Sequence, residues 1–211
     1  MRKHRGTALI LAGLTLFFAA GGLAVYNYAD DSRASSQSAA VLDALAEAIT
    51  QNAEEKAAEA AVPAPADAVP EMATVVKDGN EYIGVIEIPS LDITLPVLAD
   101  WSYEKLKISP CRYTGSYYTD DFVICAHNYR SHFNGLRWVD MGAEVLFTTA
   151  DGVLYRYVIV NRETLQPNEN EAMTNPDADW DLTLFTCYIG GATRCTIRCQ
   201  RVQDTAPGAH T

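Results

Sequence analysis

A cysteine at the end of a predicted strand is the side chain of this sequence best suited to covalent chemistry. Residues 183–187 (Thr-Leu-Phe-Thr-Cys) are rich in β-branched and aromatic types, and the run stops shortly before Gly190-Gly191. This pattern predicts a strand that ends at Cys187. A strand end holds a side chain rigidly and leaves it accessible, as a nucleophile requires. The alternative is that Cys187 is a small buried apolar residue, the usual fate of a free cysteine.

Two other side chains make the nucleophile interpretation chemically coherent. His127 ends an apolar strand predicted at 121–127, and Arg194 opens a strand predicted at 194–202. A histidine can hold the proton of a thiol and pass it to a leaving amine. An arginine stays charged at every working pH and can stabilise a tetrahedral oxyanion. We therefore expect Cys187 to be the nucleophile, His127 the general acid and base, and Arg194 the group that stabilises the oxyanion or the substrate.

The two faces of the last predicted strand, 194–202, differ in their side chains. Strand periodicity places Arg194 and Arg198 on one face, which we expect to line the groove. Cys195 and Cys199 lie on the other face, which we expect to be core. His132 is either a second groove residue or an exposed loop histidine.

The cysteine pattern does not indicate a metal site. The chain has five cysteines, an odd number that leaves at least one thiol free, and no CxxC pair. The spacing from Cys195 to Cys199 is not a common zinc spacing. We expect no metal and no cofactor.

The N-terminal segment predicts membrane attachment. Three basic residues precede residues 8–26, an apolar run without a charge that is long enough to cross a bilayer. Basic residues stay in the cytoplasm, so the rest of the chain is expected outside the cell, with the helix as a retained single-pass anchor. A cleaved signal peptide is the alternative. The net charge of −11, with no basic face after the N-terminus, argues against nucleic-acid binding.

A spacer separates this segment from the folded part. Residues 34–61 are rich in Ala, Glu and Gln and are either a helix with a thin apolar face or a disordered acidic stalk. Prolines in 62–70 favour an extended linker, so that anchor, stalk and linker hold a domain away from the membrane. The expected divisions are a basic cap and transmembrane anchor (1–29), a stalk and linker (30–79), a catalytic domain (80–203) and a C-terminal tail (204–211).

The folded part is predicted to be all-β. Seven or eight short strands with tight turns and little helix indicate a barrel or a sandwich. The predicted strands are 82–88, 91–97, 121–127, 143–149, 153–160, 183–187 and 194–202, with helical turns at 103–108 and 133–140. Three loops are expected to form the groove walls, namely 101–115, 132–138 and 166–180.

Together these residues resemble the sortases, the membrane-anchored cysteine transpeptidases of Gram-positive bacteria. Residues 183–187 match the TLxTC motif of that family, His127 matches its histidine after an apolar strand, and Arg194 matches its arginine after the cysteine. Residues 86–91 and 95–97 resemble the opening strands. The resemblance covers residues 80–203 and keeps the order of the motifs. Ala126-His127-Asn128 is most similar to class B forms, and the class is left open.

The resemblance implies a fold and an activity. The fold would be a closed eight-stranded β-barrel with short helical turns. The activity would be cleavage of a C-terminal LPxTG-like sorting signal on secreted proteins, through a thioacyl intermediate on Cys187. The acceptor would be an amine of a peptidoglycan precursor or of a pilin. Two alternatives remain, a wall-associated cysteine peptidase that uses water and a non-enzymatic anchored β-domain.

Overall fold

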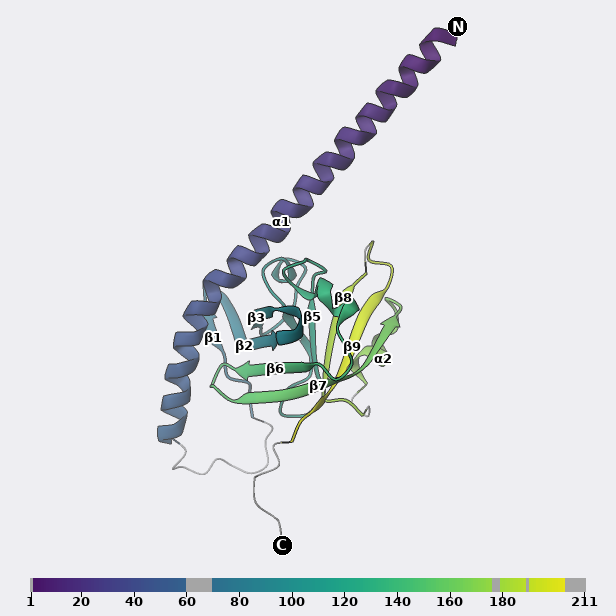
Figure 1. Ribbon diagram of the computed structural model, residues 1–211. Coiled ribbons are helices and arrows are strands. Elements are labelled where there is room, and N and C mark those ends of the chain that lie inside the picture. Colours follow the sequence, from purple (N-terminus) through teal and green to yellow (C-terminus); the bar gives the residue numbers. More distant parts are fainter. Residues whose placement is uncertain (1, 60–69, 176–178, 189, 204–211) are drawn as a thin grey trace.

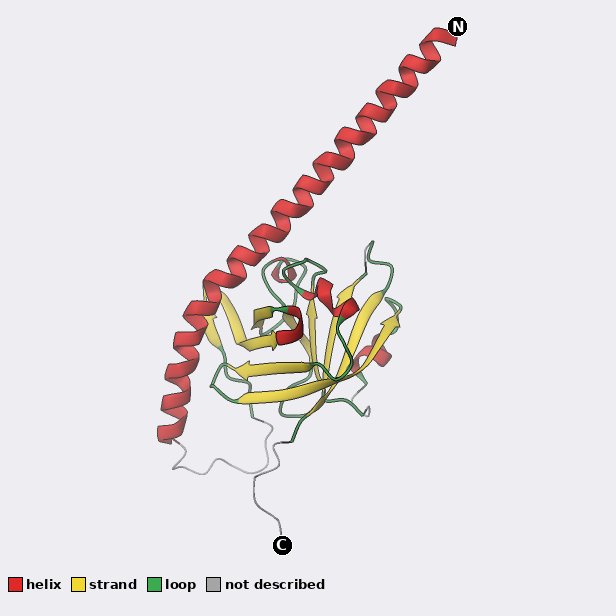
Figure 2. Cartoon of the chain, viewed as in Figure 1, coloured by secondary structure: helices red, strands yellow, loops and turns green. Residues whose placement is uncertain are grey.

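The computed structural model describes residues 2–59, 70–175, 179–188 and 190–203. A long helix precedes a set of strands, with short helices between some of them (Figures 1 and 2). In chain order the elements are α1 (Arg2–Glu59), β1 (Val75–Lys77), β2 (Asn80–Ile88), η1 (Pro89–Leu91), β3 (Ile93–Leu98), η2 (Lys105–Lys107), β4 (Cys111–Thr114), β5 (Phe122–Ala126), η3 (Phe133–Trp138), β6 (Glu144–Thr149), β7 (Leu154–Leu165), α2 (Asn170–Thr174), β8 (Leu182–Cys187) and β9 (Arg194–Arg201).

Strands β2 to β9 close into an eight-stranded barrel. Their order is β2-β3-β4-β5-β8-β9-β7-β6, and β6 pairs back onto β2. The pairs β3–β4 and β5–β8 are parallel and the others are antiparallel. The short strand β1 pairs with the start of β2 as a hairpin. The closed eight-stranded barrel expected from the resemblance is therefore confirmed.

The barrel interior is filled by aromatic and aliphatic side chains. Tyr117, Phe122 and Phe147 are fully buried and pack on one another at ring-centroid distances of 5.1 to 5.8 Å. Such edge-to-face and tilted ring contacts add to the free energy gained from burying the apolar area. This packing makes the barrel that carries the strands rigid.

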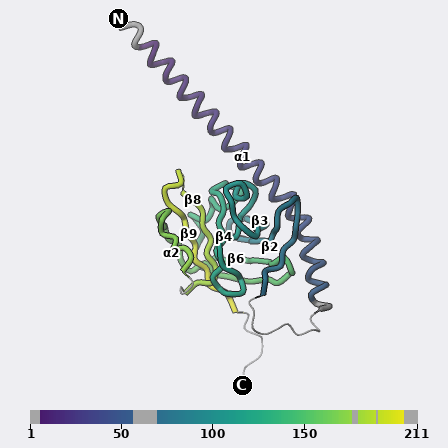
Figure 3. Tube along the Cα trace, turned by 180° about the vertical axis from the view of Figure 1, so that it is seen from behind, coloured from purple at the N-terminus to yellow at the C-terminus, as the bar shows by residue number. Residues whose placement is uncertain are grey.

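Helix α1 is continuous, and its two halves have different surroundings. The apolar N-terminal part projects away from the barrel, and the later part lies along it (Figures 1 and 3). Ala34, Val41 and Leu45 are buried against the barrel. The Ser38 hydroxyl donates to the Ile108 carbonyl at 3.0 Å. The segment expected as a stalk is thus helical through residue 59, and it packs on the barrel instead of acting as a free spacer. The rest of the expected stalk and linker, up to residue 69, and the expected C-terminal tail at 204–211 lie outside the described residues.

The strand predictions differ from the structure at β1, β3, β4 and β7. Strand β1 was not predicted, and β3 begins at Ile93, after η1, instead of at residue 91. The short strand β4 was not predicted, because its four residues follow Pro110 and carry little pattern. Strand β7 continues to Leu165, past a register shift between Ile159 and Asn161 that breaks the alternation. The predicted loop 166–180 contains the one-turn helix α2.

Candidate active site

Cys187 is the exposed last residue of a strand that is otherwise buried. The Thr186 hydroxyl donates to the Ala126 carbonyl of β5 at 2.8 Å. The Thr183 hydroxyl accepts a hydrogen bond from Arg198 Nη1 at 2.8 Å. Both threonines are buried and bonded, so the backbone that carries Cys187 is fixed on both sides.

Strand register brings His127 and Arg194 to the same end of the barrel as Cys187. In the parallel pair β5–β8, Ala126 lies opposite Thr186, so the next residues along the two strands are His127 and Cys187. In the antiparallel pair β8–β9, Cys187 lies directly opposite Arg194. The three residues expected to act together are therefore carried by three adjacent strands at one barrel edge.

The turn after Cys187 is tight. The hairpin continues one step beyond the strand, since the Tyr188 amide donates to the Thr193 carbonyl at 2.8 Å. Gly190 and Gly191 have φ values of 87° and 72°. Side chains other than glycine rarely adopt this backbone region, so the glycine pair is what lets β9 return directly to the cysteine.

His127 is half-buried and stacked on an aromatic ring. The rings of His127 and Tyr129 are 4.8 Å apart at an angle of 28°. Burial lowers the pKa of His127, the charge of Asp30 acts in the opposite direction, and the charge of Lys107 adds to the lowering. A histidine whose pKa is held below its usual value is mostly neutral near pH 7, which is the form that can accept a proton.

Arg194 is held by a neighbouring helix and a ring. Its Nη1 donates to Asn170 Oδ1, in the first turn of α2, at 3.3 Å. Its Cζ lies 5.6 Å from the centre of the Phe185 ring. The loop 166–180, expected to be a groove wall, thus reaches the guanidinium through Asn170.

Arg198 does not line a groove, and that expectation was wrong. The side chain is 1% exposed and lies beneath α2. Its nitrogens bond Glu163 Oε1 at 2.7 Å, the Thr183 hydroxyl at 2.8 Å, and the carbonyls of Ala172 and Met173 at 2.5 and 3.2 Å. The connection from β7 to β8 covers this face of β9, which the strand period alone cannot indicate.

His132 is fully buried. It is therefore neither the groove residue nor the exposed loop residue that the sequence suggested. Neither ring nitrogen has a hydrogen-bond partner among the described residues. Burial lowers its pKa to about 4, with the charge of His127 adding to the effect. His132 is therefore neutral near pH 7.

The other four cysteines are buried. Burial raises the pKa of Cys111 to about 12 and raises those of Cys125, Cys195 and Cys199 as well. Thiols of this kind stay protonated and react poorly. Among the described residues, Cys187 is the exposed thiol.

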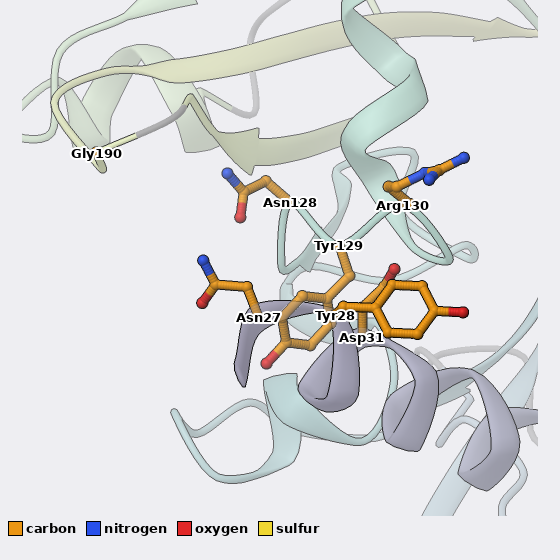
Figure 4. Close-up of a pocket in the computed structure, with 7 residues that line it drawn as sticks. All are labelled: Asn27, Tyr28, Asp31, Asn128, Tyr129, Arg130 and Gly190. Atoms are coloured by element: carbon orange, nitrogen blue, oxygen red, sulfur yellow. The ribbon is translucent and has the colours of Figure 1, made fainter. Parts of the chain in front are cut away.

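Helix α1 reaches the loop that follows His127. The Tyr129 hydroxyl donates to Asp30 Oδ2. Asp31 Oδ1 accepts from the Ser131 amide at 3.1 Å and from the Ser131 hydroxyl at 2.6 Å. Figure 4 shows the cavity of about 530 Å³ at this junction, lined by Asn27, Tyr28, Asp31, Asn128, Tyr129, Arg130 and Gly190.

Sequence reasoning missed the partners that hold the three expected residues. Tyr129 lies two positions after His127, but nothing local indicates that its ring folds back onto the imidazole. Asp30 and Asn170 lie far from the site in sequence. Only the packing of α1 and α2 on the barrel shows that they belong to the surroundings of the site.

Comparison with known proteins agrees with this geometry. Residues 86–202 match the family model described as the sortase domain. Sortase C1 of GBS pilus island 1 matches with a TM-score of 0.60 and 21% identity, over 82% of this chain and 96% of that one. Streptococcus pneumoniae sortase C matches with a TM-score of 0.59 and 23% identity, over 79% and 98%.

A further match is Clostridium perfringens sortase C, solved with the C-terminal cell wall sorting motif. Its TM-score is 0.51 and its identity 22%, over 76% of this chain and 89% of that one. A class D sortase of the same species also matches. These are class C and class D enzymes, so the likeness of Ala126-His127-Asn128 to class B forms finds no support among them. No curated protein matches the sequence.

Proposed function

The chain belongs to the sortase family of cysteine transpeptidases, and from this membership we propose that it cleaves a C-terminal LPxTG-like sorting signal of secreted proteins and transfers the acyl group to an amine. The observation that carries the proposal is the alignment of His127, Cys187 and Arg194 on three adjacent strand ends. The homologue solved with a cell wall sorting motif supports this substrate class.

The proposed mechanism has two halves. The Cys187 sulfur attacks the carbonyl carbon of the scissile peptide bond, and the Arg194 guanidinium stabilises the negative charge on the carbonyl oxygen. His127, protonated by the thiol, gives that proton to the departing amine, and a thioester remains on Cys187. In the second half an acceptor amine attacks the thioester, and His127 takes the proton that the amine loses. The thiolate leaves and is ready for another cycle.

The proposed acceptor is an amine of a peptidoglycan precursor or of a pilin. The likeness to sortase C1 of a pilus island supports the pilin alternative. Incubation of the protein with sorting-signal peptides and each candidate amine, followed by mass spectrometry, distinguishes the two.

We also propose that α1 anchors the enzyme in the cell membrane, with its N-terminus in the cytoplasm and the barrel outside. Of the described helices, α1 alone is long and apolar enough to cross a bilayer by length and composition. Arg2, Lys3 and Arg5 precede the apolar run, and basic residues favour the cytoplasmic side. Protease protection of the barrel in sealed vesicles tests the orientation.

The activity is tested with one substitution and one added amine. Cys187→Ala is expected to abolish both the thioacyl adduct and peptide cleavage, while Cys199→Ala, at a buried thiol, leaves the adduct intact. In the wild-type protein, added triglycine is expected to yield a ligated product. Cleavage that persists in Cys187→Ala contradicts the proposal, and release of the free acid alone, despite excess triglycine, indicates a hydrolase instead.

A further inference from the structure

The helix that carries the apolar segment also contacts the loop that carries the histidine. Two consecutive carboxylates of α1 bind this loop, because Asp30 accepts from the Tyr129 hydroxyl and Asp31 accepts from the Ser131 amide and hydroxyl. Figure 4 shows the Tyr129 ring lying across α1. These contacts join segments about a hundred positions apart in the chain, so they exist only when α1 is docked.

Tyr129 connects this contact to the site. One face of its ring stacks on His127 at 4.8 Å, and the ring also lies 5.3 Å from the buried ring of His132. The hydroxyl at the far end of the ring is bound by Asp30. The ring is therefore held at both ends, and it fixes one face of the His127 imidazole.

We infer that Tyr129 is a positioning residue for His127 and that Asp30 of the anchor helix holds Tyr129 in place, so that the helix preceding the barrel completes the active site. The inference rests on the proposed role of His127 in proton transfer. A general acid must lie within hydrogen-bond reach of the atom it protonates, and an imidazole at the start of a loop has freedom to rotate unless a neighbour restricts it. The stacked ring supplies that restriction.

The hydrogen bond to Tyr129 is the main cause that lowers the pKa of Asp30, with burial opposing it. Asp30 is thus a carboxylate near pH 7, and its negative charge favours the protonated form of His127. The docked helix therefore sets both the orientation of the imidazole and part of its proton affinity. The other titratable or charged groups around His127 are Lys107 at the end of η2, Tyr129 and His132 on its own loop, Cys187 on β8 and Arg194 on β9. On α1 itself, Arg33 forms an ion pair with Asp30.

The same contact places the site near the membrane. The apolar run ends at residue 26, and four more residues of helix, at a rise of about 1.5 Å each, put Asp30 only about 6 Å further along the axis. With α1 spanning the membrane as proposed, a barrel docked through Asp30 presents His127 close to the lipid surface. A free stalk would not fix the site at this height.

The test uses the full-length chain in lipid nanodiscs. Tyr129→Phe keeps the ring and removes the bond to Asp30, and Asp30→Asn removes the charge and keeps the shape. Asp43→Asn is the matched control, because Asp43 is an exposed carboxylate of the same helix. For each variant we would measure kcat and KM for peptide ligation across pH, and the titration of the His127 imidazole by NMR, assigned with a His127→Gln sample.

Tyr129→Phe is expected to lower kcat about tenfold with little change in KM. A general acid accelerates a reaction by about 10²–10⁴-fold, and a less well oriented imidazole loses a part of that factor. Asp30→Asn is expected to lower the pKa of His127 and to move the pH profile to lower pH. Asp43→Asn is expected to match the wild type in every measurement. If Tyr129→Phe and Asp30→Asn both match Asp43→Asn in kcat, KM and His127 titration, the inference is overturned.

Two features keep this test separate from that of the proposed function. The NMR titration needs no substrate, so it reports on the link from Asp30 to His127 even if no sorting signal is cleaved. The melting temperature of each variant, together with alkylation of Cys187, shows whether the barrel is intact. A folded Tyr129→Phe protein with wild-type turnover counts against the inference, and the absence of ligation in the wild type counts against the proposed function alone.

Discussion

Replacing the buried Arg198 by methionine should destabilise the barrel and impair the active site together. The side chain is 1% exposed, and it donates to one carboxylate, one hydroxyl and two carbonyls. Its carboxylate partner, Glu163, is 33% exposed and remains hydrated when the arginine is removed. The cost therefore comes mainly from the buried acceptors of Thr183 and Met173, which lose their donor, whereas the Ala172 carbonyl is only partly buried.

The magnitude follows from those two buried acceptors. A buried acceptor left without a partner costs about 1–3 kcal/mol, and methionine fills most of the space of the arginine stem. We expect Arg198→Met to lower the free energy of unfolding by about 3 kcal/mol. This value is toward the lower end of the summed cost, because the loop around α2 can move and let water bond the carbonyls that lose the arginine. Urea unfolding of the full-length chain, followed by tryptophan fluorescence, measures this value.

The control is a second arginine with the same substitution. Arg156 pairs with Glu144 at 2.9 Å, and both side chains are more than 40% exposed. Such surface ion pairs contribute about 0–1 kcal/mol, so Arg156→Met should change little. If Arg198→Met costs no more than Arg156→Met, the buried network does not stabilise the fold as argued.

Arg198 also affects catalysis through α2. By binding the carbonyls of Ala172 and Met173 it fixes the helix whose Asn170 binds Arg194. At a temperature where Arg198→Met remains folded, we expect a loss of about tenfold in kcat/KM for peptide ligation. Removing an oxyanion donor outright costs about 10²–10³-fold, and here the donor is only less well oriented. Wild-type turnover in the folded variant would refute this link.

Three further substitutions test single contacts. Thr186→Val removes the hydroxyl that bonds the Ala126 carbonyl and should cost about 1–2 kcal/mol in urea unfolding; a neutral result would mean that β5 and β8 do not need this bond. Gly84→Ala places a Cβ 2.1 Å from the Thr148 carbonyl oxygen at a φ of 153° and should cost about 2–3 kcal/mol; a wild-type midpoint would contradict the close approach. The pKa of His132 falls from 6.5 to about 4 on folding, so as the pH is lowered the unfolded chain takes up this proton before the folded one. The contribution of His132 to the free energy of unfolding is therefore fully present above pH 6.5 and is lost as the pH falls toward 4. His132→Phe should therefore weaken the fall in unfolding free energy between pH 7 and pH 4.5, and an unchanged pH dependence would contradict the burial.

The sequence predicted the residues with local patterns and missed those that depend on packing. Cys187 and Arg194 lie at the ends of regular strands, and a turn with two glycines dictates that they face each other. His127 ends an apolar strand, but its alignment with Cys187 requires the parallel pairing of β5 with β8, which alternation cannot specify. Here the resemblance to a family supplied what periodicity could not.

The N-terminal helix shows the same limit. Residues 34–49 have a thin apolar stripe, and a stripe of this kind fits both a solvated stalk and a helix docked on a partner. The partner is the barrel itself, because Ala34, Val41 and Leu45 are buried on it. The polar contacts of Asp30 and Asp31 could not be predicted either, since two acidic residues after an apolar run look like an ordinary membrane boundary.

The two threonines of residues 183–187 explain why one strand can organise the whole site. Thr186 bonds the Ala126 carbonyl and so fixes the cysteine strand against the strand that ends before His127. Thr183 binds Arg198, which holds α2 and, through it, the partner of Arg194. His127 and Arg194 are thus each connected to the strand that carries Cys187 through a different buried hydroxyl, that of Thr186 for His127 and that of Thr183 for Arg194. A valine at either position keeps the strand and its apolar packing but removes one of the two links. Thr186→Val should therefore impair proton transfer by His127, and Thr183→Val should impair the stabilisation of the oxyanion by Arg194.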